Sequence, residues 1–225
     1  MSISVSGQTP DQVPEPVARV ADLMSAFRRR WFLCGGWAVD AWLGRQTRDH
    51  QDVDISVFED DQRALFDHLS GWHLIAHDSV TPDSTESWDG RRLERPAHGH
   101  ASLSLDAVSA WVSEPAAQHD GFELEVILNE RSGREWIFSV DPRLILNLRR
   151  CIQRSSWGLP TAVPEILCFY KATAYFGFKD VKERPQDESD FLELLSLLSS
   201  TRRKWLREAI ARVQPDHPWL AQLSL

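Results

Sequence analysis

The sequence predicts an α+β (α/β) protein: a small mixed sheet flanked by helices, followed by a C-terminal helical domain. Strand-like and helix-like segments alternate through the first part of the chain, and the clearest strand, Phe122 to Leu128, alternates apolar and polar positions. From Pro164 almost to the end, apolar residues instead recur at helical spacing. This change of pattern places a domain boundary near residue 158, between a domain 1–158 and a domain 159–225.

The chain opens with a helical pattern over 17–27, which follows two prolines. The apolar run 31–34 then predicts a buried strand, and helical spacing resumes from Trp37 to Leu43. Between strand and helix stands the pair Gly35-Gly36. Glycines at a helix N-terminus let unpaired backbone N–H groups approach an anion, so this turn suits a phosphate.

Alternation from Asp52 to Val57 predicts the next strand. On a strand, Asp52 and Asp54 point to the same face, roughly 6 to 7 Å apart. Two carboxylates held side by side repel each other unless cations lie between them, and a pair of Mg²⁺ ions about 3.5 to 4 Å apart would match this spacing. The alternative is a solvated strand edge, which is what an isolated Asp-x-Asp usually marks.

Further elements follow in order. Residues 62–69 predict a helix and 72–76 a strand, which together form an α/β crossover. Residues 78–100 predict a loop with a short strand near Arg92 to Glu94.

The strand Phe122 to Leu128 places Glu123 and Glu125 on its polar face, and a turn at 129–133 leads into a hairpin partner at 136–140. Residues 141–160 are predicted to be a connection.

The C-terminal part begins with a helix that has Pro164 at its first position. A second helix follows the segment 184–191, and a last helix is predicted over 202–213. The remaining tail carries Trp219 and Leu220, which we expect to dock on the core.

Residues 35–57, GGWAVDAWLGRQTRDHQDVDISV, resemble the signature of the nucleotidyltransferase superfamily, which has a DNA polymerase β-like fold. The segment is most similar to the aminoglycoside 2″-adenylyltransferase branch. The resemblance implies metal-dependent transfer of a nucleoside monophosphate, with Gly35 and Gly36 near the triphosphate and Asp52 and Asp54 as metal ligands. Arg48, just before the carboxylate strand, is expected to reach a phosphate or to form a structural salt bridge.

In this superfamily a third carboxylate comes from a neighbouring strand. Glu125 matches that position best and would act as metal ligand and general base, with Glu123 as the alternative. Aspartate is commoner there, and glutamate reaches one methylene further. The competing interpretation is that both are exposed strand glutamates.

A lone lysine on a helix is ordinarily a surface residue. The branch, however, combines a helix lysine with an [RK]-x-[KR]-D-x-x-D segment at the head of the next helix. Lys171, Asp187 and Asp190 match those positions, while Gln186 stands where a basic residue is commoner. The resemblance implies that Lys171 contacts the triphosphate, with Asp187 or Asp190 orienting it.

Composition is that of an ordinary soluble protein, with three widely spaced cysteines in apolar surroundings that we expect to be reduced. No apolar run is long enough to span a bilayer and the N-terminus does not resemble a signal peptide, so a cytoplasmic protein is expected. The net charge of −8 argues against nucleic acid as a partner and favours a neutral or cationic acceptor.

The leading hypothesis is therefore an enzyme that uses two Mg²⁺ ions and transfers AMP from ATP to a hydroxyl of a small molecule, such as an aminoglycoside-like or lincosamide-like antibiotic. Two alternatives stay open: a toxin-type nucleotidyltransferase that modifies tRNA or protein, and a non-catalytic nucleotide-binding module.

Overall fold

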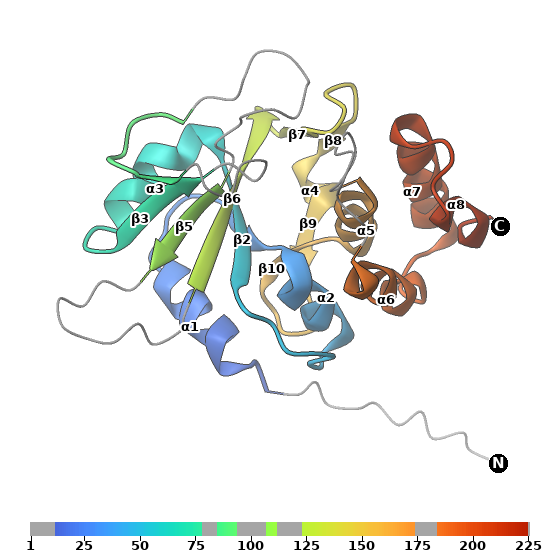
Figure 1. Ribbon diagram of the computed structural model, residues 1–225, viewed down its shortest axis with the longest axis horizontal. Helices are drawn as coiled ribbons and strands as arrows, with labels where there is room; N and C mark the ends of the chain where they lie inside the picture. The colour runs from blue at the N-terminus through green and yellow to red at the C-terminus, as the bar shows by residue number, and fades with distance from the viewer. Residues whose placement is uncertain (1–11, 78–84, 94–106, 112–122, 174–183, 225) are drawn as a thin grey trace.

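The computed structural model describes residues 12–77, 85–93, 107–111, 123–173 and 184–224. Its strands form a mixed sheet in the order β4-β3-β5-β6-β2-β1-β10-β9, and the short strands β7 and β8 extend from β6. Figure 1 shows the C-terminal helices α5 to α8 gathered at one side of the sheet, beyond β9 and β10. The strands are β1 (Trp31–Leu33), β2 (Val53–Phe58), β3 (His73–His77), β4 (Thr85–Ser87), β5 (Ala107–Trp111), β6 (Glu123–Ser132), β7 (Glu135–Ile137), β8 (Ile145–Asn147), β9 (Ile152–Arg154) and β10 (Pro160–Ala162). The helices are α1 (Glu15–Met24), α2 (Gly35–Leu43), the short 3₁₀ helix η1 (Glu59–Asp61), α3 (Gln62–His68), α4 (Leu148–Cys151), α5 (Pro164–Thr173), α6 (Pro185–Leu195), α7 (Ser200–Val213) and α8 (Trp219–Gln222).

Strand β2 lies at the centre of the sheet. It pairs antiparallel with β1 and parallel with β6, in a register that sets Asp54 opposite Glu125. Its residues Val53, Ile55 and Val57 are buried, as the alternating pattern predicts. Because paired residues on neighbouring strands share a face, this register brings the acids of β2 and β6 together.

Helix α2 starts at the end of β1 and contacts β2 and β10, and its residues Trp37, Ala38, Val39 and Ala41 are buried. The Cys34 N–H donates to the Asp54 carbonyl at 3.0 Å, which ties the start of this helix to β2. The helix ends at Gly44, whose φ of 72° is the left-handed conformation that closes many helices. The predicted strand, glycine pair and helix are thus confirmed.

The C-terminal helices form where the sequence predicts them. Helix α5 is buried almost all round, and Phe191 of α6 stacks on Trp219 of α8 with ring centroids 4.2 Å apart. The three cysteines are free and buried, as expected. Strand β10, at 160–162, pairs with β1 just beyond the predicted boundary, and the helical part begins at Pro164. The division into domains 1–158 and 159–225 stays a prediction.

Three predictions of local structure are wrong. No strand forms at Arg92 or Leu93; the strand of this region is β4, which pairs with β3, and Leu93 N–H instead donates to the Gln62 side chain at 2.8 Å. Glu94 lies outside the described residues. The turn predicted at 129–133 is shorter, because β6 continues to Ser132 and pairs directly with β7.

The predicted connection 141–160 is also wrong, since it contains β8, α4, β9 and the first residue of β10. These elements have three or four residues each, too few for an alternating or helical pattern to emerge from the sequence. Strand β5 falls where no element was predicted. Within the described residues no helix is long and apolar enough to cross a membrane.

Candidate active site

Three acidic side chains meet at one edge of β2 and β6. Carboxylate oxygens of Asp52, Asp54 and Glu125 all lie within 4.8 Å of one another, and each residue is partly buried. Asp52 precedes β2 by one residue and so shares the face of Asp54, while the strand register supplies Glu125. The structure therefore brings together the three acids that the sequence singles out. The side chain of Glu123, the alternative third acid, lies outside the described part of the chain.

The electrostatics of this triad favour a bound cation. Burial, followed by the charges of Asp52 and Glu125, raises the pKa of Asp54 to about 8, and the charge of Lys171 partly opposes the rise. Ionising all three carboxylates at this separation costs free energy through their mutual repulsion, unless positive charge lies between them. Their oxygens are hard ligands of the kind that Mg²⁺ prefers. The donor set therefore fits a divalent cation such as Mg²⁺.

The glycine pair at the start of α2 makes room for side chains of the chain itself. Gly35 has φ 62°, and a Cβ there would lie 2.5 Å from Asp54 Cγ. A Cβ at Gly36 would lie 2.6 Å from both Arg48 Nη2 and His50 Cε1. The carboxylate of Asp54 is thus seated against the first turn of α2, where helix N–H groups provide positive potential.

Lys171 of α5 lies between two buried acids of α6. Its Nζ is 2.9 Å from Asp187 Oδ1 and 2.7 Å from Asp190 Oδ2, and only 10% of the side chain is exposed. Asp187 also pairs with Arg184 at 3.1 Å. The lysine and both aspartates that the sequence singles out are therefore in contact, and the lysine charge is close enough to lower the pKa of Asp54.

Arg48 precedes β2 and joins this charged group from another element. Its Nη2 lies 3.3 Å from Asp190 Oδ2, and its Nε is buried with no hydrogen-bond partner among the described residues. Arg48 is expected either to reach a phosphate or to form a structural salt bridge, and the structure contains the salt bridge, with Asp190. Asp190 of α6 therefore contacts both Lys171 and Arg48.

Sequence reasoning missed Asp40, which is completely buried in α2. Its carboxylate accepts hydrogen bonds from Thr47 Oγ1 at 2.5 Å and from His50 Nε2 at 2.7 Å. The available signal was the acid itself, because every other residue of GGWAVDAWL is apolar or glycine. A carboxylate in such a helix requires polar partners from elsewhere in the chain.

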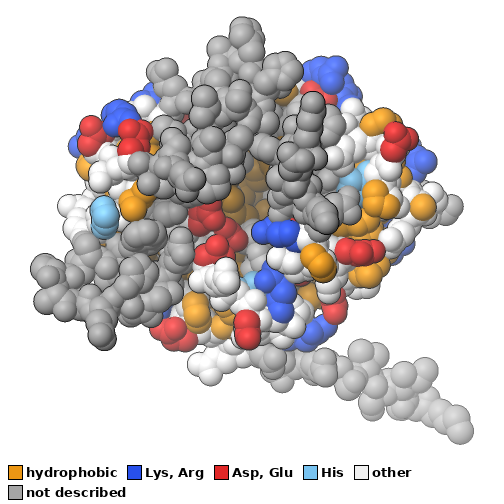
Figure 2. Space-filling model, viewed as in Figure 1, with side chains coloured by type: hydrophobic (Ala, Val, Ile, Leu, Met, Phe, Trp, Pro, Cys, Tyr) orange, Lys and Arg blue, Asp and Glu red, His pale blue; other side chains and the backbone are white. Residues whose placement is uncertain are grey.

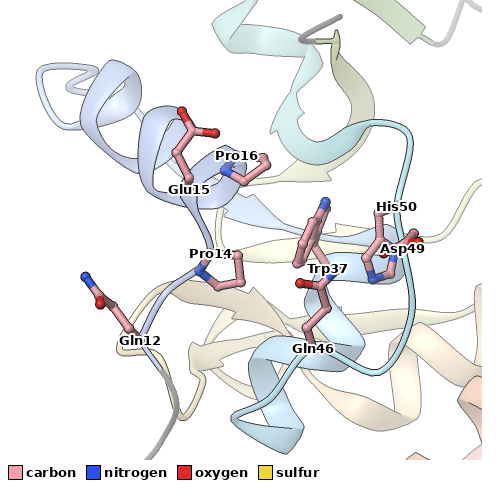
Figure 3. Close-up of a pocket in the computed structure, with 8 residues that line it drawn as sticks. All are labelled: Gln12, Pro14, Glu15, Pro16, Trp37, Gln46, Asp49 and His50. Atoms are coloured by element: carbon pink, nitrogen blue, oxygen red, sulfur yellow. The ribbon is translucent and has the colours of Figure 1, made fainter.

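A hollow of about 590 Å³ lies beside the segment that leads into β2. It lies between the start of α1, including Pro14, Glu15 and Pro16, and the side chains of Trp37 and His50, as Figure 3 shows. On the face of the molecule drawn in Figure 2, acidic side chains gather beside basic ones near the middle. Opposite charges are thus concentrated on this face.

The mixed sheet and its flanking helices match the nucleotidyltransferase fold of solved structures. Residues 16–91 match a family model described as Aminoglycoside-2''-adenylyltransferase. No sequence among the curated proteins matches the chain.

Solved structures share the fold over most of the chain. A lincosamide antibiotic adenylyltransferase, LnuA with lincomycin bound, aligns at 14% identity and a TM-score of 0.52, covering 84% of this chain and all of that one. ANT(2'')-Ia in complex with adenylyl-2''-tobramycin aligns at 13% identity and a TM-score of 0.55, covering 87% of this chain and 95% of that one. A nucleotidyltransferase-like protein from Paracoccidioides brasiliensis aligns at 13% identity and a TM-score of 0.50, covering 96% of this chain and 93% of that one.

At these identities the structural likeness establishes the fold, and residues 16–91 match the family model. Together they confirm the predicted superfamily, its fold and the prediction of an enzyme of the nucleotidyltransferase class.

Proposed function

We propose that the protein is a Mg²⁺-dependent adenylyltransferase that transfers AMP from ATP to a hydroxyl of a small molecule, an aminoglycoside-like or lincosamide-like antibiotic. The observation that carries the proposal is the convergence of Asp52, Asp54 and Glu125 beside the start of α2. The family match over residues 16–91 supports the choice of branch, and the neighbours with lincomycin and adenylyl-tobramycin support the class of acceptor.

In this proposal Asp52, Asp54 and Glu125 hold two Mg²⁺ ions. Bound Mg²⁺ supplies positive charge against the phosphates and lowers the pKa of the acceptor hydroxyl. Burial first, and then the charges of Asp52 and Glu125, raise the pKa of Asp54 to about 8, so both effects oppose the ionised form that binds a metal. A divalent cation would neutralise the negative charge of the three carboxylates.

The transfer itself is an in-line displacement. The acceptor oxygen attacks the α-phosphorus of ATP, a bond from oxygen to phosphorus forms, and the bond from the α-phosphorus to the bridging oxygen breaks, so that pyrophosphate leaves. Glu125 accepts the proton of the acceptor hydroxyl as general base. Positioning and electrostatic stabilisation account for most of the catalysis in such a reaction.

Other residues bind the nucleotide. Gly35 and Gly36 lie at the N-terminus of α2, where helix N–H groups suit the triphosphate. Lys171 carries a positive charge that Asp187 and Asp190 hold in place, and Arg48 adds a second positive charge next to Asp190. Lys171 belongs to the C-terminal helices and the three acids belong to the sheet. In this proposal the nucleotide therefore binds between the two predicted domains.

Transfer can be measured directly. The protein is incubated with Mg²⁺, labelled nucleoside triphosphates and a panel of aminoglycosides and lincosamides, with Asp54→Asn as the control. Label on an antibiotic from the wild type but not from the control is the expected result. Label on RNA or protein would favour the toxin-type alternative, and nucleotide binding without any transfer would favour the non-catalytic module.

A further inference from the structure

Asp40 is a buried acid that the proposed chemistry does not use. It lies in α2 between buried apolar neighbours, and 0% of its surface is exposed. An ionised carboxylate in such surroundings is costly unless hydrogen bonds compensate it. Its two oxygens have partners at 2.5 and 2.7 Å, Thr47 and His50, both in the loop between α2 and β2.

These two bonds hold the loop at points three residues apart. Because a carboxylate offers only acceptors, His50 donates its Nε2 hydrogen to Asp40. The ring of His50 is 3% exposed and lies against Trp37, with ring centroids 4.3 Å apart. Figure 3 shows the two side chains as neighbours. The Nδ1 and Cε1 atoms of the ring occupy the space that a side chain on Gly36 would need.

The anchored loop carries two residues of the proposed site. Arg48 stands between the anchored positions, and its guanidinium lies beside both Gly36 and Asp190. From His50 the chain reaches Asp52 in two residues, a span of at most about 7 Å. His50 is therefore anchored within two residues of Asp52, a member of the acidic triad.

We propose that Asp40 is a positioning residue, which acts through Thr47 and His50 to fix the loop that presents Arg48 and Asp52. The proposal rests on the proposed function for its kinetic consequence, while the anchoring of the loop can be measured without activity. A purely structural role would instead make Asp40 one more buried acid whose loss lowers stability alone.

Asp141 provides the matched control. It is also buried, and it pairs with Arg143 at 2.7 Å and with Arg212 at 2.8 Å, its ion-pair partners among the described residues. We expect Asp141→Asn to lower stability and to leave kcat and the KM for ATP unchanged. We expect Asp40→Asn to lower kcat about 100-fold, the size of effect that a misplacement of about 1 Å produces.

A double-mutant cycle tests whether Asp40 acts through His50. If it does, Asp40→Asn, His50→Gln and the double variant lose similar amounts of kcat/KM, because each breaks the same contact. Losses that multiply in the double variant would overturn the proposal.

Hydrogen exchange of residues 44–52 in the free protein tests the anchor itself. Exchange is expected to accelerate at least tenfold in Asp40→Asn and to stay unchanged in Asp141→Asn. Unchanged exchange in Asp40→Asn would overturn the proposal. If the wild type shows no transfer, the proposed function fails, and the exchange result still decides the role of Asp40.

Should Asp40→Asn not fold, Thr47→Val is the second variant, because it removes one of the two donors to Asp40. It is expected to lose about tenfold in kcat and to show faster hydrogen exchange in the loop. A wild-type kcat together with wild-type exchange would overturn the proposal.

Discussion

The close approach of Asp54 to the start of α2 makes Gly35→Ala a test of how the triad is positioned. The added Cβ would lie 2.5 Å from Asp54 Cγ and closer still to Oδ2, whereas ordinary contacts begin at 3.4 Å, so the carboxylate must move by at least about 1 Å. A displacement of that size costs about 100-fold in rate. The left-handed backbone at Gly35 adds a loss of about 1 to 2 kcal/mol in the free energy of unfolding.

Gly133→Ala separates these two effects. Gly133 has φ 59°, almost the same as Gly35, yet nothing lies within 4 Å of its Cβ position. We expect both variants to lose about 1 to 2 kcal/mol in chemical denaturation, and only Gly35→Ala to lose kcat/KM for AMP transfer. Full activity of Gly35→Ala, or an equal loss of activity in Gly133→Ala, would refute the reasoning.

Further variants test the proposed roles separately. Asp54→Asn should abolish transfer while circular dichroism shows a folded protein. Glu125→Gln should slow transfer far more than Glu123→Gln in steady-state kinetics. Lys171→Met should raise the KM for ATP. It should also lower the free energy of unfolding by about 3 kcal/mol, because it leaves Asp187 and Asp190 buried without their lysine. Hydrogen bonds from arginine lower the pKa of Asp141 to about 2, so its stabilising contribution is complete above about pH 4 and is lost as the pH falls through 2. Asp141→Asn should flatten the acid limb of the stability curve, by about 1 kcal/mol since the arginines are exposed.

Each of these outcomes has a contrary result. Transfer by Asp54→Asn would remove the metal-ligand assignment, and a greater loss from Glu123→Gln would reassign the general base. Lys204→Met is the control for Lys171→Met, because Lys204 is 68% exposed and its substitution should change neither quantity. An unchanged KM in Lys171→Met would remove the triphosphate contact. An unaltered acid limb in Asp141→Asn would show that its ion pairs do not stabilise the fold.

The sequence predicts the parts of the site that are encoded locally. One unbroken segment, 31–58, contains β1, the glycine pair, α2 and β2. Periodicity within it is enough to place Asp52 and Asp54 on one face. Alternation places Glu123 and Glu125 on the polar face of their strand, because a period of two fixes the face of every residue, and the resemblance to the superfamily then favours Glu125. The motif on α5 and α6 is also local, since its lysine and aspartates belong to consecutive helices.

Contacts between distant segments were not predictable from the sequence. Arg48 and Asp190 are 142 residues apart, and no pattern in either segment specifies the pair. Side chains of Asp54, Arg48 and His50 lie against Gly35 and Gly36, and no pattern in the sequence indicated these contacts. Asp40 was overlooked because the hydrogen bonds that explain a buried acid appear only in three dimensions. The short strands β8, β9 and β10 depend on pairing within the sheet and carry no pattern of their own.

A crystal structure of the protein with Mg²⁺ and a non-hydrolysable ATP analogue tests the central claim most directly. The account predicts Mg²⁺ bound by Asp52, Asp54 and Glu125, with the triphosphate extending from the start of α2 towards Lys171. A nucleotide bound elsewhere, or Mg²⁺ that contacts none of the three acids at saturating concentration, would contradict it.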